Sequence, residues 1–302
     1  MGISINTNIA ASRASHFLAS NHANLQKSLD RLSSGRRITE PADDAGGLAV
    51  AMKMNHSIQG LSGASKNIGN AISFLQVQDG ILASAGDIVS RMGELKGLYG
   101  DVLKSTTDKA TYDAEFNDLR DQLYSLTQTQ FNGIYLFGDW NQATDALSAT
   151  AIPTELDIYI TENGSSGSSV KIDRAVLGAE LNVDAAGAAV GALDGTIGLA
   201  APSGNDLTLA DADFTADAFT NAVRNVAKLR AANGGQVSRL QYAQADVDSK
   251  MTNMTAAYGR IMDVDIAAES ANLAKQQILV QASAAMTAQA NSANDVALLL
   301  LQ

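Results

Sequence analysis

Large apolar residues recur at heptad spacing near the start of the chain. They are Leu18, Leu25, Leu29 and Leu32, with spacings of seven, four and three. Such spacings place side chains on one seam of a helix, as in a coiled coil. Gly35 follows the last leucine, and a glycine at that place is typical of a left-handed helix cap. The pattern predicts an N-terminal helix that stops at Gly35.

The same repeat continues along much of the chain. A second helix is predicted after Pro41 and towards Tyr99, marked by residues seven apart, which are Leu61, Ile68, Leu75, Leu82 and Val89. A third is predicted to end at the turn signal Asn132-Gly133. After residue 214 the pattern resumes at Phe219, Val223, Val226, Val237, Leu240, Val247, Met251, Met254, Tyr258 and Ile261. The two helical ends are therefore predicted to pack on each other.

The middle of the chain alternates like a strand. Apolar residues alternate at Leu156, Ile158 and Ile160, and again at Val170 and Ile172. A Gly/Ser-rich loop separates the two runs, which predicts a β-hairpin. The predicted fold class is mainly α, with long antiparallel helices from both chain ends forming coiled-coil bundle layers and a small β-rich outer lobe in the middle.

Charge is distributed unevenly along the chain. Residues 1–40 hold five Lys/Arg against two Asp/Glu, whereas residues 262–302 hold one against four. The ends are therefore oppositely charged, which favours their pairing. Residues 141–214 hold two basic and eleven acidic groups and account for −9 of the total −11. Such charge belongs on a solvated surface and argues against nucleic acid as a partner.

Composition and motifs exclude several classes of function. No apolar run approaches the ~20 residues of a membrane span, and the first twelve residues lack the pattern of a secretory signal peptide. The chain has no cysteine, which excludes disulfides and thiolate metal sites. Its three histidines, His16, His22 and His56, form no i, i+4 pair and no HExxH sequence. The carboxylates of Asp43-Asp44 fit the first turn of a helix better than a calcium loop. We expect no catalytic residue, metal or cofactor.

Short motifs follow one another in order at both ends of the chain. The N-terminal part carries Ile5-Asn6-Thr7-Asn8, Arg31-Leu32-Ser33-Ser34-Gly35, Asp43-Asp44-Ala45-Gly46-Gly47 and Thr129-Gln130-Phe131-Asn132-Gly133. The C-terminal part carries Gly259-Arg260-Ile261, Asp263-Val264-Asp265, Gln277-Ile278-Leu279, Ala288-Gln289-Ala290-Asn291 and finally Leu298 to Leu301. With these motifs the chain resembles bacterial flagellin, the structural subunit that polymerises into the flagellar filament used for motility.

The resemblance implies three layers. Residues 1–40 and 262–302 would form an inner terminal coiled-coil layer, disordered in the monomer, and residues 41–133 and 215–261 a helical core bundle. Residues 134–214 would form the β-hairpin and acidic outer lobe. The apolar residues expected to serve assembly are Leu18, Leu25, Leu29, Leu32, Ile278, Leu279, Val280, Leu298, Leu299 and Leu300.

The resemblance also implies partners and a location. Flagellins are secreted unfolded through the flagellar type III export apparatus, and a dedicated chaperone binds their C-terminal helix. They polymerise with copies of themselves under a filament cap, beyond the hook-junction proteins. A receptor-facing surface sensed by an innate immune receptor, the flagellin-specific Toll-like receptor, matches at Arg91, Glu94, Leu95 and Glu115. A second basic residue of that pattern is Gly93 here, which weakens the expected recognition.

Three other hypotheses fit parts of the sequence. A flagellin-like hook–filament junction protein would share the end motifs, but it would be scarce in sheared filaments. A cytoplasmic coiled-coil scaffold would explain the heptads, but not the ordered motifs. A flagellin with a metalloprotease insert would need an HExxH helix in the middle of the chain, and the sequence contains none.

Overall fold

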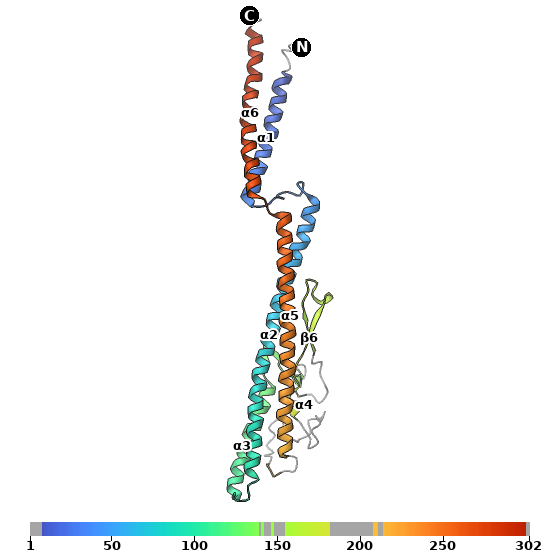
Figure 1. The fold of residues 1–302 in the computed structure, drawn as a ribbon, viewed down its shortest axis with the longest axis vertical. Helices are drawn as coiled ribbons and strands as arrows, with labels where there is room; N and C mark the ends of the chain where they lie inside the picture. The colour runs from blue at the N-terminus through green and yellow to red at the C-terminus, as the bar shows by residue number, and fades with distance from the viewer. Residues whose placement is uncertain are drawn as a thin grey trace. The chain divides into compact units, whose positions relative to one another are not determined.

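The chain divides into two compact units in a computed structural model. The structure describes residues 8–138, 140–141, 146–147, 155–181, 208–210 and 214–299. A terminal unit comprises residues 1–58 and 252–302, and a central unit comprises residues 59–251. Long helices come from both chain ends, and short strands lie in the middle of the sequence (Figure 1). The predicted fold class is confirmed.

In the terminal unit two helices from opposite ends of the chain lie side by side. Helix α1 spans Ile9–Ser34 and helix α6 spans Ile266–Leu299. The two chain ends lie at the same end of this pair, so the helices are antiparallel (Figure 1). The side chain of Asn8 accepts a hydrogen bond from the Ala11 N–H and caps α1. Gly35 adopts a φ of 69° and ends the helix, as the sequence predicts.

The segments that leave α1 and enter α6 are hydrogen-bonded to each other. The Arg37 N–H donates to the Met262 carbonyl at 2.6 Å, and the Val264 N–H donates to the Gly35 carbonyl at 3.1 Å. A small apolar cluster of Ile38, Ala51 and Met262 packs beside them. These contacts join the two linkers into one structure within the terminal unit.

The core of the central unit is built from three helices. These are α2 (Ala45–Tyr99), α3 (Thr106–Thr127) and α5 (Ala216–Met262), and both α2 and α5 extend into the terminal unit. The predicted heptad track on α2 is buried, because none of its members is more than 2 % exposed; they are Leu61, Ile68, Leu75, Leu82 and Val89. They pack with other buried residues of the unit, among them Phe116, Leu123, Phe219, Val226, Leu240 and Val247.

Two polar side chains, one buried and one half-buried, also connect these elements. Asn233 of α5 donates from Nδ2 to the Leu75 carbonyl of α2 at 2.8 Å. Gln244, which interrupts the apolar repeat of α5, donates from Nε2 to the Ser65 hydroxyl at 2.6 Å. An unpaired polar group would be costly in such surroundings, so these bonds fix how α2 and α5 align.

The strands form antiparallel pairs. They are β1 (Gln130–Phe131) with β2 (Ile134–Tyr135), β3 (Trp140–Asn141) with β4 (Ala146–Leu147), and β5 (Glu155–Tyr159) with β6 (Ser169–Asp173). The predicted hairpin is confirmed, because Leu156 lies opposite Ile172 and Ile158 opposite Val170. A short 3₁₀ helix, η1 (Gly164–Ser166), lies in its loop, and helix α4 (Leu177–Leu181) follows β6. Most of the predicted acidic lobe lies outside the described residues.

Candidate assembly surface

The face along which α1 and α6 meet combines small and polar side chains with half-buried leucines. Ser28 and Ser283 are buried there. Asn21 donates from Nδ2 to the Ser283 hydroxyl at 3.4 Å, and Asn272 donates from Nδ2 to the Ser28 hydroxyl at 3.3 Å. Hydrogen bonds of this kind set the alignment of the helices but contribute little net free energy, about 0.5–1.5 kcal/mol each. These polar contacts therefore add little to the stability of the pair.

The predicted leucines of α1 divide between the seam and the outer surface. Leu18, Leu25 and Leu32 are half-buried beside the seam. They alternate with Asn21 and Ser28, which occupy the positions between them in the same heptad. Leu29 lies off this seam and is 43 % exposed.

The predicted residues of α6 divide in the same way. Val280 is half-buried near Ser283, whereas Ile278 is 66 % exposed and Leu279 is 37 % exposed. Leu298 and Leu299 lie in the last turn of α6, where the structure describes the backbone only, and Leu300 lies outside the described residues.

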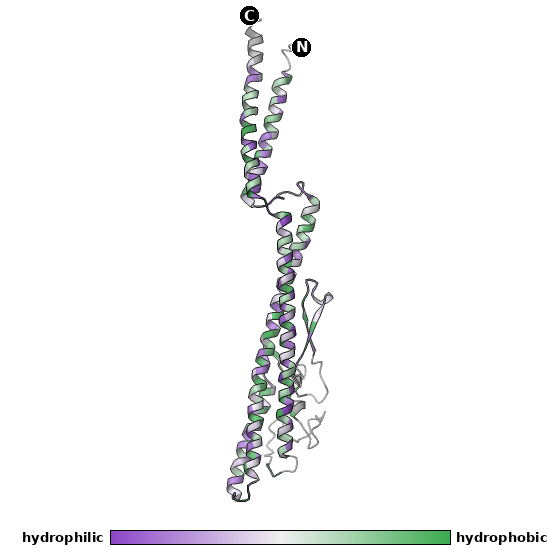
Figure 2. Ribbon diagram, viewed as in Figure 1, coloured by the Kyte–Doolittle hydropathy of each residue, from purple (hydrophilic) through white to green (hydrophobic). Residues whose placement is uncertain are grey.

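Several large apolar residues of the terminal helices face water. The residues that share this property are Ile9, Phe17, Leu29, Ile266, Ile278, Leu279 and Met286. Figure 2 shows hydrophobic segments distributed along both α1 and α6 between hydrophilic ones. These side chains are available for contact with another molecule. Phe17, Ile9, Ile266 and Met286 are not part of the predicted heptad seam.

Charged side chains fasten the end of α1 to the start of α2. Asp43 forms ion pairs with Lys27 and with Arg31, the latter at 3.6 Å. The Asp43 carboxylate also accepts hydrogen bonds from the backbone N–H and the hydroxyl of Thr39. Lys27 and these hydrogen bonds hold the pKa of Asp43 far below its usual value. Asp44 caps α2 by accepting from the Gly47 N–H at 2.7 Å, so the two carboxylates precede the helix rather than lying in its first turn as predicted.

Three of the four predicted receptor-facing residues lie together in the central unit. The Arg91 guanidinium lies 2.8 Å from a carboxylate oxygen of Glu115 and 3.1 Å from one of Glu94. Both carboxylates raise the pKa of Arg91. Leu95 is completely buried, so it does not share this surface. A Cβ atom added at Gly93 would lie 3.3 Å from the Cβ of Phe219, so this glycine faces α5.

Metal sites and membrane spans are both absent from the part of the chain that the structure describes. No group of three or more His, Cys, Asp or Glu within it is placed to hold a metal ion. None of the described helices is both long enough and apolar enough to cross a membrane.

Comparison with known proteins identifies the family. The model of the bacterial flagellin N-terminal helical region matches residues 5–142, and that of the C-terminal helical region matches residues 216–301. Flagellin of Bacillus subtilis (strain 168) is 35 % identical over 311 residues, which cover 99 % of each chain. The flagellar filament 30.7 kDa core protein of Treponema maltophilum is 32 % identical over 95 % of this chain and 96 % of that one.

One solved structure supports the fold alone. A protein of Vibrio parahaemolyticus, assigned as a flagellar hook-associated protein, is 16 % identical to this chain and superposes with a TM-score of 0.56. The match covers 73 % of this chain and 100 % of that one.

The paired terminal helices and the helical core define a mainly helical structural protein. The family models span most of the sequence at both ends, and the relatives match over nearly their whole length. The chain therefore belongs to the bacterial flagellin family. It is a structural subunit of the flagellar filament, so the predicted family, function and location are confirmed.

Proposed function

We propose that the chain polymerises through the outward apolar residues of α1 and α6. The observation that supports this is the division of side chains on the terminal pair. The residues fully buried at the seam, Ser28 and Ser283, are small and polar, and the leucines beside them are only half-buried. Large apolar residues such as Phe17 and Ile278 face water. A helix pair usually buries its large apolar residues between the helices. Here those residues are available to neighbouring copies.

The same exposure of apolar residues explains how polymerisation would stabilise the α1–α6 helix pair. Helical stability in proteins comes mainly from packing an apolar face, and the leucines at this seam are only half-buried in the single chain. Polymerisation removes the outward residues from water, and each fully buried side chain contributes about 1.5–3 kcal/mol. In our proposal residues 1–40 and 262–302 form the inner layer, residues 41–133 and 215–261 the core bundle, and residues 134–214 the outer lobe.

The proposal includes the route by which the subunit reaches the filament. A chain without cysteine can be threaded unfolded through the flagellar type III export apparatus, because no cross-link has to be opened. The exposed residues Ile278, Leu279 and Met286 of α6 provide an apolar strip for an export chaperone. A chaperone there would also delay premature polymerisation. The filament cap and the hook-junction proteins would contact the same terminal surfaces at the two ends of the polymer.

The proposed role is purely structural and involves no catalysis.

The cluster of Arg91, Glu94 and Glu115 is exposed, and an innate immune receptor could contact it on a free subunit. Leu95 would contribute only through packing, since it is covered in the isolated chain. The receptor contact is therefore expected to be centred on the charged cluster.

Seeded assembly of the purified chain tests the proposal. After salt is added, electron microscopy should show filaments whose length grows with protein concentration. Oligomers of one fixed size would contradict it. Sheared flagella separate the subunit from a junction protein, because a filament subunit forms the bulk of the sheared material. Retention of the chain inside the cell would instead favour a scaffold.

A further inference from the structure

The turn between α2 and α3 presents two bare apolar side chains. Val102 is 92 % exposed and Leu103 is 90 % exposed, and we call this pair the apolar knob. The turn is well fastened, because the Asp101 carboxylate accepts from the Leu103 N–H at 2.9 Å. Ser105 then caps α3 through a reciprocal pair of hydrogen bonds with Asp108. The knob therefore projects from a defined turn.

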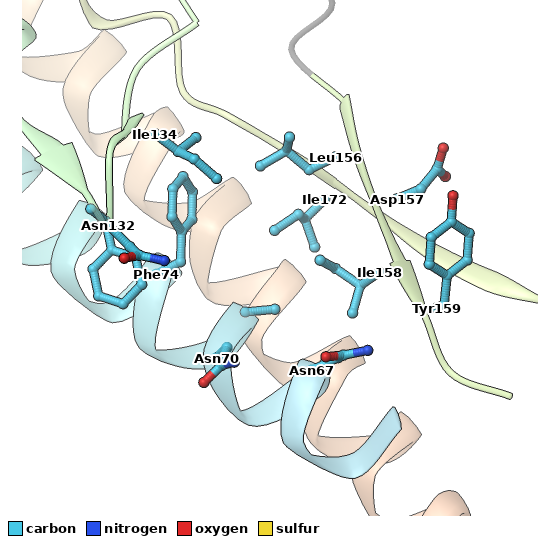
Figure 3. Close-up of a pocket in the computed structure, with 12 residues that line it drawn as sticks. Asn67, Asn70, Phe74, Asn132, Ile134, Leu156, Asp157, Ile158, Tyr159 and Ile172 are labelled. Carbon is cyan, nitrogen blue, oxygen red and sulfur yellow. The ribbon is translucent and has the colours of Figure 1, made fainter. Parts of the chain in front are cut away.

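The same unit contains an apolar pocket that its own chain leaves open. The pocket has a volume of about 560 Å³ and lies between α2, the β1–β2 turn and the β5–β6 hairpin. Figure 3 shows Leu156, Ile158 and Ile172 pointing from the hairpin towards α2, where Phe74 lies. Pockets of ~300–1,000 Å³ accommodate drug-sized molecules, so two aliphatic side chains fit in this one. Ile134 at its edge is 39 % exposed.

The knob cannot reach the pocket of its own chain. Phe74 is the pocket residue on α2 that lies nearest to the α2–α3 turn. The 25 residues between Phe74 and Tyr99 rise about 1.5 Å each, which separates the two features by about 38 Å along one helix. A contact between knob and pocket must therefore join two molecules.

We infer that the apolar knob of one subunit inserts into this pocket of the next subunit in the filament. The inference rests on the proposed polymerisation. An open polymer needs a heterologous contact, in which two different surfaces of one chain fit each other. The knob and the pocket are such a pair, both apolar and both on the central unit.

The contact has a geometric consequence. Neighbouring subunits joined by it are displaced along the direction of α2 by about 40 Å, the separation of knob and pocket on one chain. The contact also leaves one free knob and one free pocket at the ends of any row of subunits, so rows can grow without limit.

A cysteine pair tests the contact directly, because the natural chain has no cysteine. The double variant Leu103→Cys with Ile134→Cys is assembled into filaments, treated with a mild oxidant and run on a non-reducing gel. We expect a ladder of covalent dimers, trimers and longer species. The matched control is Leu103→Cys with Tyr242→Cys, because Tyr242 is 80 % exposed on α5 but lies outside the pocket. This control, and unassembled protein of the first variant, should give no ladder.

Each result decides the matter. Filaments without a ladder, or an equal ladder from the Tyr242 control, overturn the knob-and-pocket contact and leave the proposed function standing. If the cysteine variant does not assemble, Val102→Ser with Leu103→Ser decides, because both side chains are exposed in the monomer. An increase of about tenfold or more in the critical concentration, with unchanged monomer melting, supports the contact. An unchanged critical concentration overturns it. If the natural chain itself forms no filaments, the proposed function fails, and the contact fails with it.

Discussion

Replacing two exposed residues of α6 should weaken polymerisation without affecting the isolated subunit. The variant is Ile278→Ser combined with Leu279→Ser. Ile278 is 66 % exposed and Leu279 is 37 % exposed in the single chain. Most of the contribution of Ile278, and part of that of Leu279, is therefore made only when another copy covers them. The monomer should melt within a degree or so of the natural chain, because few of its own contacts are removed.

The size of the effect follows from these exposed fractions. Full burial of such a side chain contributes about 1.5–3 kcal/mol. The exposed share corresponds to about 1–2 kcal/mol for Ile278 and about 0.6–1.1 kcal/mol for Leu279. Together they amount to about 1.6–3.1 kcal/mol, and each 1.4 kcal/mol is a factor of ten in an equilibrium constant. The critical concentration for assembly should therefore rise by about 10–150-fold.

Sedimentation of seeded filaments measures that concentration. The control variant is Gln277→Ser with Gln281→Ser, two exposed polar positions on the same helix. Serine has a lower helix propensity than glutamine or leucine, so the control accounts for that effect and isolates the loss of apolar surface. The control should polymerise at nearly the natural concentration. A critical concentration for the Ile278/Leu279 variant that stays within about threefold of the control would refute the reasoning.

Two further predictions concern the stability of the single chain. Asp43→Asn should lower the melting temperature of the subunit at neutral pH, followed by circular dichroism. The pKa of Asp43 is lowered by Lys27 from its ordinary value of 3.8, so its stabilisation is present above that pH and is lost as the pH falls through the lowered pKa. The two proteins should therefore melt alike in strong acid, and an equal difference at every pH would count against this ion pair. Gly60→Ala should destabilise the central unit by about 1–3 kcal/mol, because its Cβ would lie 2.7 Å from the Cβ of Glu162. A Cβ atom added at Gly63 would have no atom within 4 Å, so Gly63→Ala should stabilise the central unit by about 0.5–1 kcal/mol in denaturant titrations. Equal effects of the two variants would be inconsistent with the packing described.

The sequence predicts the core of the central unit well, because the apolar repeat there marks residues that the same unit buries. Apolar residues seven apart on α2, such as Ile68, Leu75 and Leu82, are all buried within the same unit. The hairpin is equally predictable, since alternation along β5 and β6 matches the face that covers α2. Local capping by Gly35 also follows from chain geometry alone.

The terminal helices show where the pattern is not enough. A heptad repeat identifies a stripe on a helix, but it does not say whether the same chain or another copy covers it. Leu25 faces the seam with α6, whereas Leu29 faces water. The polar members of the seam, Asn21 and Ser28, could have been found as heptad positions between the leucines. Phe17 belongs to no apolar repeat, so only its exposure in the structure identifies it as a candidate assembly residue.

The apolar knob and the pocket could not be predicted from the sequence, for a different reason. Val102 and Leu103 are an ordinary apolar pair in the chain, and their exposure depends on the turn that Asp101 fastens. The pocket joins residues of α2 and the hairpin that are far apart in sequence. Such a cavity depends on how closely the hairpin packs, which periodicity does not specify.

Amide hydrogen exchange on the monomer and on the filament tests the central claim most directly. That claim is that the α1–α6 pair depends on neighbouring copies for its stability. Amides of α1 and α6 should exchange rapidly in the monomer and become strongly protected in the filament, while those around Leu75 and Leu240 in the central unit are protected in both. Equal protection of α1 and α6 in monomer and filament would contradict the account, because the terminal pair would then be stable by its own contacts.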